Sequence, residues 1–422
     1  MKRSHFRRAA LVVACALSPV RAADILLTPP AGGGVSVTNA TGALTRLRIA
    51  DDGSVTIPGG NLSLANPSSA IAGSILTGTN RFIHNFGSGN TFLGELAGNF
   101  SLSGTNNTGS GANALAVNTT GTANTATGSS ALNSNTTGSN NTAAGTLALA
   151  ANTTGPDNTA VGTAALAFNT TGFQNTASGR DALFSNTTGH ANTAVGYQVL
   201  KNTTTGSVNV GVGYQSLVGN TTGQGNTAIG QQALHDNTTG ELNIAIGYLA
   251  GYHLSTGDFN IAIGSQGVFN DANTIRVGDS LFQSRTFIAG IRGITTGSAN
   301  AIPVMIDSNG QLGTVSSSAR FKDDIADMES STDALMQLRP VTFHYKADQD
   351  PEGRTLQYGL VAEEVAQVYP GLVARTPDGQ VETVMYQFLP SMLLNEFQKL
   401  RRANDAMAAE LAEIKRMLGR QR

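Results

Sequence analysis

A glycine recurs every 17 residues through the middle of this chain, and the period does not slip over eleven copies. An asparagine follows each of these glycines by three residues, and a second glycine follows by seven. The glycines that set the period are Gly87, Gly104, Gly121, Gly138, Gly155, Gly172, Gly189, Gly206, Gly223, Gly240 and Gly257. A fixed short period is typical of solenoids, in which each repeat contacts only its neighbours. We therefore expect residues 87–267 to form a stack of coils.

Each repeat predicts one short strand and one tight turn. A five-residue core such as 158–162 or 243–247 alternates Ala or Gly with other side chains, which predicts a strand with one small face and one β-branched face. The sequence Asn-Thr-Thr-Gly at 118–121 predicts the turn, because Asn bonds to nearby backbone and Gly permits positive φ. A leucine column also repeats, at Leu115, Leu132, Leu149, Leu166, Leu183, Leu200, Leu217 and Leu234. Only stacked coils could bury these leucines.

Coils this narrow, in a chain with few aromatic residues, offer a small core. We therefore expect several chains to pack their small faces together, as a homotrimer. With coils about 4.8 Å apart, eleven of them would make a rod about 50 Å long. The pattern is similar to the Asn- and Gly-rich head repeats of trimeric autotransporter adhesins, although those have a shorter period. The expected fold class is mainly β, a trimeric β-solenoid or β-prism rod.

Residues 1–22 have the features of a signal peptide: a basic start, an apolar run and a small-residue cleavage site that ends at Ala22. We expect the protein to be exported, to the extracellular space or the cell surface. Lipoprotein anchoring through Cys15 and a weak twin-arginine signal at Arg7 and Arg8 are alternatives. Cys15 is the only cysteine, so cleavage after Ala22 would leave no disulfide to stabilise the fold.

Composition argues against several classes of partner. A net charge of -2 gives no basic footprint for nucleic acid, and no apolar stretch of about 18 residues follows the N-terminus to span a membrane. The repeats have no Asp column and the histidines no ligand spacing, so we expect no metal and no cofactor. The best acid pair in the rod, Glu241 and Asp258, lies in a variable column that indicates an exposed turn. No column of aromatic residues favours glycan binding.

The regions on either side of the repeats read as further β structure. Residues 23–86 contain short strand-like runs between Gly and Pro turns, which predict an N-terminal β cap or tip. Residues 268–316 predict a β neck, with strand-like segments at 273–278, 286–291 and 302–306 and a hairpin turn at 307–310.

The composition changes sharply at Ser316, because residues 317–422 hold more than half of the charged residues of the chain. We expect a separate domain there. Its end predicts a coiled coil at about 389–418, with a heptad seam at Leu393, Phe397, Leu400, Asn404, Met407, Leu411, Ile414 and Leu418. The alternative is a single amphipathic helix that packs on its own domain.

Ser317 precedes Lys322 by five residues at this boundary. A serine becomes a nucleophile when a base takes its proton, and a lysine can be that base only in its neutral form. The spacing alone favours a plainer interpretation, in which Ser318 caps a helix start and a solvated run of charges follows.

The segment 317–325, Ser-Ser-Ala-Arg-Phe-Lys-Asp-Asp-Ile, resembles the opening of the endosialidase-type intramolecular chaperone domain (peptidase S74 family), whose pattern is Ser-Asp-x-Arg-x-Lys-x-x-Ile. Segments 338–343 and 358–365 and the terminal coiled coil also look like that family, which occurs on phage tail spikes and fibres and on myelin regulatory factor. The resemblance implies an α+β chaperone domain that aligns a homotrimer and then removes itself.

In that family the serine is the nucleophile and the lysine its base, roles that fall here on Ser317 and Lys322. Ser318 stands where phage members have Asp. By family analogy the scissile bond joins Ser317 and Ser318, whereas a hydroxyl that attacks the preceding carbonyl would cut between Ser316 and Ser317.

We therefore expect a secreted or surface trimeric fibre, adhesin-like or tail-fibre-like, that matures by autoproteolysis. It would act as a serine endopeptidase on itself only, with no external substrate. One alternative is a polysaccharide-degrading spike. Another is a glycan-binding fibre whose site lies in residues 23–86.

Overall fold

The computed structural model describes residues 35–38, 45–49, 55–57, 74–346, 348–350, 355–376 and 378–420. The expected signal peptide and Cys15 lie outside these residues. The chain divides into two compact units, with the boundary between Phe287 and Ile288. Within the described part of the chain, no helix is both long enough and apolar enough to cross a membrane.

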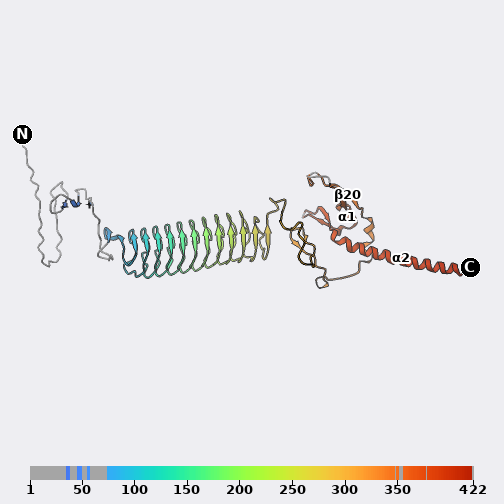
Figure 1. Cartoon of the computed structure of the whole chain (residues 1–422), viewed down its shortest axis with the longest axis horizontal. Helices are drawn as coiled ribbons and strands as arrows, with labels where there is room; N and C mark the ends of the chain where they lie inside the picture. Colours follow the sequence, from blue (N-terminus) through green and yellow to red (C-terminus); the bar gives the residue numbers. More distant parts are fainter. Residues whose placement is uncertain are drawn as a thin grey trace, which may run out of the picture. The chain divides into compact units, whose positions relative to one another are not determined.

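The first unit contains the expected solenoid, in which every repeat contributes one three-residue strand to a continuous parallel sheet (Figure 1). Each residue pairs with the residue 17 positions later, as Thr159 does with Thr176. The strands are β6 (Thr91–Leu93), β7 (Thr108–Ser110), β8 (Thr125–Thr127), β9 (Thr142–Ala144), β10 (Thr159–Val161), β11 (Thr176–Ser178), β12 (Thr193–Val195), β13 (Val210–Val212), β14 (Thr227–Ile229), β15 (Ile244–Ile246) and β16 (Ile261–Ile263). The 17-residue β-solenoid is therefore confirmed.

The two ends of the sheet differ from its repeats. At the N-terminal end β4 (Ile75–Thr77) and β5 (Asn80–His84) form an antiparallel hairpin, and β5 pairs antiparallel with β6. This hairpin covers an edge that would otherwise offer unpaired backbone groups. At the other end β17 (Ile275–Val277) pairs with β16 through Ile261 and Ile275, so the last coil is shorter than the others. A separate antiparallel sheet joins β1 (Val35–Thr38), β2 (Thr45–Ile49) and β3 (Val55–Thr56).

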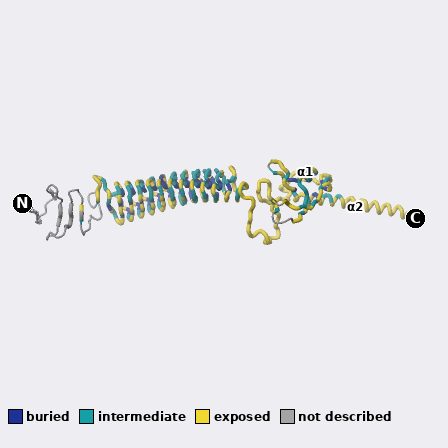
Figure 2. The backbone as a smooth tube through the Cα atoms, turned by 90° about the horizontal axis from the view of Figure 1, so that it is seen from above, coloured by how far each residue is buried: buried dark blue, intermediate teal, exposed yellow. Residues whose placement is uncertain are grey.

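The interior of the solenoid is built from small and aliphatic side chains. The middle residue of most strands is an alanine, and these alanines and the leucine column are fully buried, whereas the flanking strand residues point outward (Figure 2). The expectation that small faces pack between chains is wrong, because Ala126, Ala143 and their equivalents lie in the core of their own chain. The coil is so narrow that only small residues fit beside the leucines.

The leucine column adopts an unusual backbone conformation. The φ angles of Leu115 to Leu234 lie between 49° and 54°, in the left-handed region that residues other than glycine seldom adopt. Each such residue costs about 1 to 2 kcal/mol of backbone strain. Burial of each leucine side chain offsets this cost, at about 1.5 to 3 kcal/mol.

Two columns of buried asparagines hydrogen-bond the coils to one another. In the first, Asn141 Nδ2 donates to the Gly155 carbonyl at 2.9 Å, and Asn141 Oδ1 accepts the backbone N–H of Asn158 at 3.0 Å. In the second, which begins the Asn-Thr-Thr-Gly turn, Asn152 Nδ2 donates to Asn135 Oδ1 at 2.8 Å and to the Gly155 carbonyl at 3.0 Å. Because buried amides are costly unless they are paired, the asparagines maintain the repeat.

The two glycine columns allow the coils to approach closely. At Gly128 a side chain would need φ of +131°, and its Cβ would lie 2.5 Å from the Gly145 carbonyl oxygen of the next coil. At Gly121 φ is ordinary, but a Cβ would lie 2.4 Å from the Gly138 carbonyl oxygen. Any larger residue would therefore separate the coils.

The second unit contains short antiparallel hairpins and helices, so it is α+β as expected. The hairpins pair β18 (Met305–Ile306) with β19 (Leu312–Gly313), β20 (Val341–Phe343) with β21 (Gln357–Gly359), and β22 (Val373–Arg375) with β23 (Val381–Val384). The helices are η1 (Ala319–Phe321), η2 (Glu329–Gln337), α1 (Ala362–Val368), η3 (Pro370–Leu372), η4 (Tyr386–Phe388) and α2 (Leu389–Gly419). A small core brings together Leu335, Val365, Leu372, Val373, Val384 and Met392.

The region between the repeats and this core was predicted only in part. The strand at 273–278 corresponds to β17, and the turn at 307–310 connects β18 to β19. Asp307 Oδ1 accepts the backbone N–H groups of Asn309 and Gln311, each at 2.9 Å, which stabilises that turn. Residues 286–291 form no strand, so that prediction is wrong. Its apolar side chains, such as Phe287 and Ile291, are exposed.

Candidate functional site

Ser317 and Lys322 lie on either side of the single 3-10 turn η1. Ser318 has extended φ and ψ angles of -68° and 135°, and the Phe321 N–H donates to its carbonyl at 3.1 Å. Lys322 is extended again, and its N–H donates to the Ala319 carbonyl at 3.1 Å. The predicted helix start is therefore present, but the Ser318 side chain makes no capping hydrogen bond.

The side chains of the predicted site are open to solvent in the single chain. Ser317, Ser318 and Lys322 are exposed, and among the described residues no hydrogen bond joins the Ser317 hydroxyl to Lys322. Two apolar neighbours, Phe321 and Ile325, are also exposed, by 65% and 68%. The turn thus brings the serine and the lysine into one short segment, but one chain by itself supplies no shielded pocket around them.

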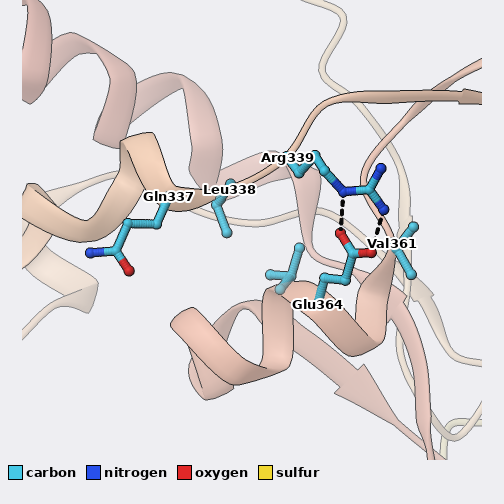
Figure 3. A pocket seen from close by; sticks show the side chains of 6 residues that line it. Gln337, Leu338, Arg339, Val361 and Glu364 are labelled. Carbon is cyan, nitrogen blue, oxygen red and sulfur yellow. Dashed lines mark hydrogen bonds and ion pairs between the residues drawn. The ribbon is translucent and has the colours of Figure 1, made fainter.

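The domain that follows this segment is joined by a two-pronged ion pair. Arg339, before β20, donates through Nε to Glu364 Oε2 at 3.1 Å and through Nη2 to Glu364 Oε1, on α1 (Figure 3). These hydrogen bonds hold the pKa of the Glu364 carboxyl below its ordinary value. Arg339 and Glu364 belong to the two segments that carried the family resemblance, and the sequence analysis did not pair them. The cavity beside them, about 30 Å³, has room for a water molecule or two and is too small for a substrate.

A polar cluster fixes the start of α2 against η2. Asn395 Nδ2 donates to the Glu329 carbonyl at 2.9 Å and to Thr332 Oγ1 at 2.6 Å. Lys399 pairs with both Asp333 and Glu396, at 2.5 Å each, and these contacts raise the pKa of the Lys399 ammonium above its ordinary value. The first turns of α2 are therefore part of the domain core, whereas the rest of the helix is exposed (Figure 2).

The predicted heptad seam lies on this exposed part of α2. Its apolar side chains remain 48% to 65% exposed in the single chain, at Leu393, Phe397, Leu400, Met407, Leu411, Ile414 and Leu418. A helix of 31 residues with an uncovered apolar stripe suits association with other helices. The coiled coil itself stays a prediction.

The rod residues considered for chemistry have structural surroundings. The Glu241 N–H donates to Asp258 Oδ1 at 2.8 Å, as in an ordinary turn between neighbouring coils. The statement that no aromatic column exists is wrong, because Tyr197 and Tyr214 occupy one column and stack at 5.5 Å, with Tyr248 two coils further along. Their spacing of 17 and 34 residues was the signal in the sequence. Within the described residues, no group of three or more His, Cys, Asp or Glu side chains is placed to hold a metal ion.

Comparison with known proteins identifies the second unit. Residues 317–374 match the family model Peptidase_S74, described as chaperone of endosialidase. The match begins at Ser317, includes η1 and the Arg339–Glu364 pair, and ends within β22. No curated protein and no solved structure matches the chain. A β-solenoid followed by this domain fits a tail-fibre-like protein.

Proposed function

We propose that this chain forms a secreted or cell-surface homotrimeric fibre, and that residues 317–422 are an intramolecular chaperone that aligns three chains and then cuts itself away. The observation that carries the proposal is the family match, which begins at Ser317, where the composition changes after the β structure. The export signal at 1–22, the N-terminal β cap or tip at 23–86 and the β neck at 268–316 complete the proposed organisation.

A rod of this kind needs an alignment device. Every coil has nearly the same backbone and the same 17-residue register, so two chains could pair one coil out of register at almost equal energy. Contacts between separate chains are also slow to form, because the entropy of bringing the segments together is lost first. The exposed seam of α2 would solve both problems by bringing three chains together at one end before the rods meet.

Self-cleavage would use Ser317 and Lys322. The Lys322 amine would take the proton of the Ser317 hydroxyl, the oxygen would attack the carbonyl carbon of the scissile peptide, and the proton would pass to the leaving nitrogen. Water would then hydrolyse the ester. Both side chains are exposed in one chain, so we expect neighbouring chains to cover the segment, since burial favours the neutral amine that a base requires. Cleavage would thus follow assembly.

Intact mass and native mass of the purified full-length chain test this proposal. We expect two fragments separated at Ser317–Ser318 or Ser316–Ser317, a trimeric N-terminal fragment, and no cleavage in Ser317→Ala. Ser308→Ala, in the exposed hairpin before the site, is the matched control and should cleave normally. Normal cleavage in Ser317→Ala would exclude the nucleophile, and a monomeric wild-type chain would exclude the trimer.

A further inference from the structure

The strands of the solenoid have an outward face that changes along the rod. Successive strand residues point to opposite sides, so the second, fourth, sixth and eighth residues after each repeat glycine point away from the core; we call these positions the outward strand face. Their burial pattern confirms this, because the middle residue of β8 is buried while Thr125 and Thr127 are exposed.

In the N-terminal half of the rod this face is polar or small. The coils that begin at Gly104 to Gly172 place there Asn106, Thr108, Ser110, Ala112, Ala123, Thr125, Thr127, Ser129, Asn140, Thr142, Ala144, Thr146, Asp157, Thr159, Val161, Thr163, Gln174, Thr176, Ser178 and Arg180. Val161 is the one large apolar residue in this set, and Asp157 and Arg180 are charged.

Towards the C-terminal end the same positions become apolar. They hold Val208, Val210, Val212, Tyr214, Leu242, Ile244, Ile246, Tyr248, Phe259, Ile261, Ile263, Ile275 and Val277, with the more polar coil of Gly223 between them. Several are widely exposed: Leu242 by 50%, Tyr248 by 67% and Phe259 by 56%. The parallel register places Ile244 beside Ile261 and Ile261 beside Ile275, so these side chains form one continuous patch.

The fold of the single chain does not require these large apolar residues. The coil at Thr125 has the same strand, the same buried alanine and the same register with threonine at the equivalent positions. Ile244 and Ile246 therefore add nothing to the interior of their coil. A continuous exposed apolar surface instead marks a surface that another molecule covers.

We propose that this apolar end of the outward strand face is where copies of this chain pack against one another, while the polar N-terminal coils keep the same face in water. The inference rests on the proposed trimer and assigns its contact surface on the rod. It replaces the small face, which lies inside each coil.

Two observations favour further copies of this chain as the occupant. The patch carries no charged residue, and symmetric packing brings identical residues together, so charges like Asp157 or Arg180 would there meet their own copies. The patch also precedes, along the chain, the domain whose helix α2 has the other long exposed apolar stripe. Three chains joined through α2 would bring the C-terminal coils together first.

The change in composition would also fix the register. Coils with nearly identical Thr-rich faces cannot distinguish a correct alignment from a slip of one coil, whereas a slip at the C-terminal end would leave an isoleucine pair uncovered and place Ile263 opposite the more polar next position. The apolar patch therefore makes one alignment better than its neighbours, which the repeats alone do not.

The test compares two matched sets of substitutions in the full-length chain. Ile244→Thr, Ile246→Thr, Ile261→Thr and Ile263→Thr together give β15 and β16 the residues of β8, so the coils should still fold. Val161→Thr with Val195→Thr is the control in the polar half and its border. Native mass spectrometry, before and after self-cleavage, measures the assembly. We expect the cleaved fourfold variant to fall to monomer, and the wild type and control to remain trimers.

Adding Ser317→Ala to the fourfold variant separates the two proposals. This uncleaved chain should still be a trimer through its C-terminal domain, so a monomer here would mean that the domain does not trimerise, whereas a cleaved fourfold variant as trimeric as wild type would overturn the interface. Single cysteines give a second measurement, because the chain has only Cys15 of its own. Ile246→Cys should form interchain disulfides under oxidation, and Ala144→Cys, its equivalent in the polar half, should not. The reverse result would also overturn the interface.

Discussion

The second asparagine column has one gap, which predicts a stabilising substitution. Thr203 stands where the other turns have asparagine, and Asn186 Oδ1, in the coil before it, is buried without a hydrogen-bond partner. Thr203 donates instead to the Asn220 carbonyl at 3.2 Å, and Asn220 Nδ2 reaches Thr203 Oγ1 at 3.4 Å. Thr203→Asn should therefore restore the column, because the two side chains are of similar size.

The magnitude follows from the hydrogen bonds gained and lost. The amide nitrogen that Thr203→Asn introduces should reach Asn186 Oδ1 and the Gly206 carbonyl, as Asn152 Nδ2 does with its equivalents. Satisfying a buried orphan acceptor is worth about 1 to 3 kcal/mol, and each further net hydrogen bond about 1 kcal/mol, against about 1 kcal/mol for the lost Thr203 bond. We expect a net stabilisation of about 2 kcal/mol, concentrated in the coils around residue 203.

Amide hydrogen exchange by mass spectrometry is the suitable assay, because repeat rods open locally and a single melting temperature averages over them. A gain of about 2 kcal/mol slows exchange in these coils roughly 30-fold, since about 1.4 kcal/mol is a factor of ten. Thr205→Asn, at an exposed position of the same turn, is the control and should change little. Unchanged or faster exchange around residue 203 would show that the asparagine columns do not stabilise the rod as argued.

Three further predictions concern the rod and the cleavage segment. Gly162→Ala should destabilise the solenoid by about 3 to 5 kcal/mol, because φ is +128° and the new Cβ would lie 2.6 Å from the Gly179 carbonyl oxygen, whereas Gly297→Ala, with open space around it, should be neutral in urea denaturation. His84 is buried with a lowered pKa, caused mainly by burial, so the N-terminal hairpin should be most stable above about pH 6.5 and lose protection as pH falls towards the lowered folded value, in hydrogen exchange; equal pH dependence in His84→Gln would contradict this. Lys322→Arg should block self-cleavage on a denaturing gel, since arginine stays protonated, and Leu411→Asp should suppress it by disrupting the seam, whereas Glu410→Asp, at an exposed non-seam position, should not.

The periodicity of the sequence was enough to predict the coils but not which side of each strand faces inward. Three-residue strands such as 159–161 alternate in both directions, and the pattern alone does not distinguish an interior from an interface. The decision lies in the coil as a whole: the leucine column and the two asparagine columns enclose a space into which only Ala or Gly fits beside them. Leucines at positive φ give no local signal, since propensity argues against that conformation.

The candidate site was predictable for the opposite reason. Ser317 and Lys322 are close in sequence, so a short turn between them follows from local rules, and η1 provides it. The Arg339–Glu364 pair, by contrast, joins residues from two separate segments and depends on how α1 packs against the chain before β20. Such a contact needs the tertiary structure, because nothing in either segment names its partner.

The strict register of the coils has a consequence for how such a rod can vary in length. Each hydrogen bond between neighbouring coils joins positions that recur in every repeat, as between Asn141 and Asn158 or between Asn158 and Asn175. Removal or duplication of one whole repeat would give every donor an equivalent acceptor and change the reach of the fibre by about 4.8 Å. A deletion of any other length would break both asparagine columns at once. Genetic drift in the repeat number is therefore structurally almost silent, and the rod can serve as a molecular ruler with 17-residue graduations.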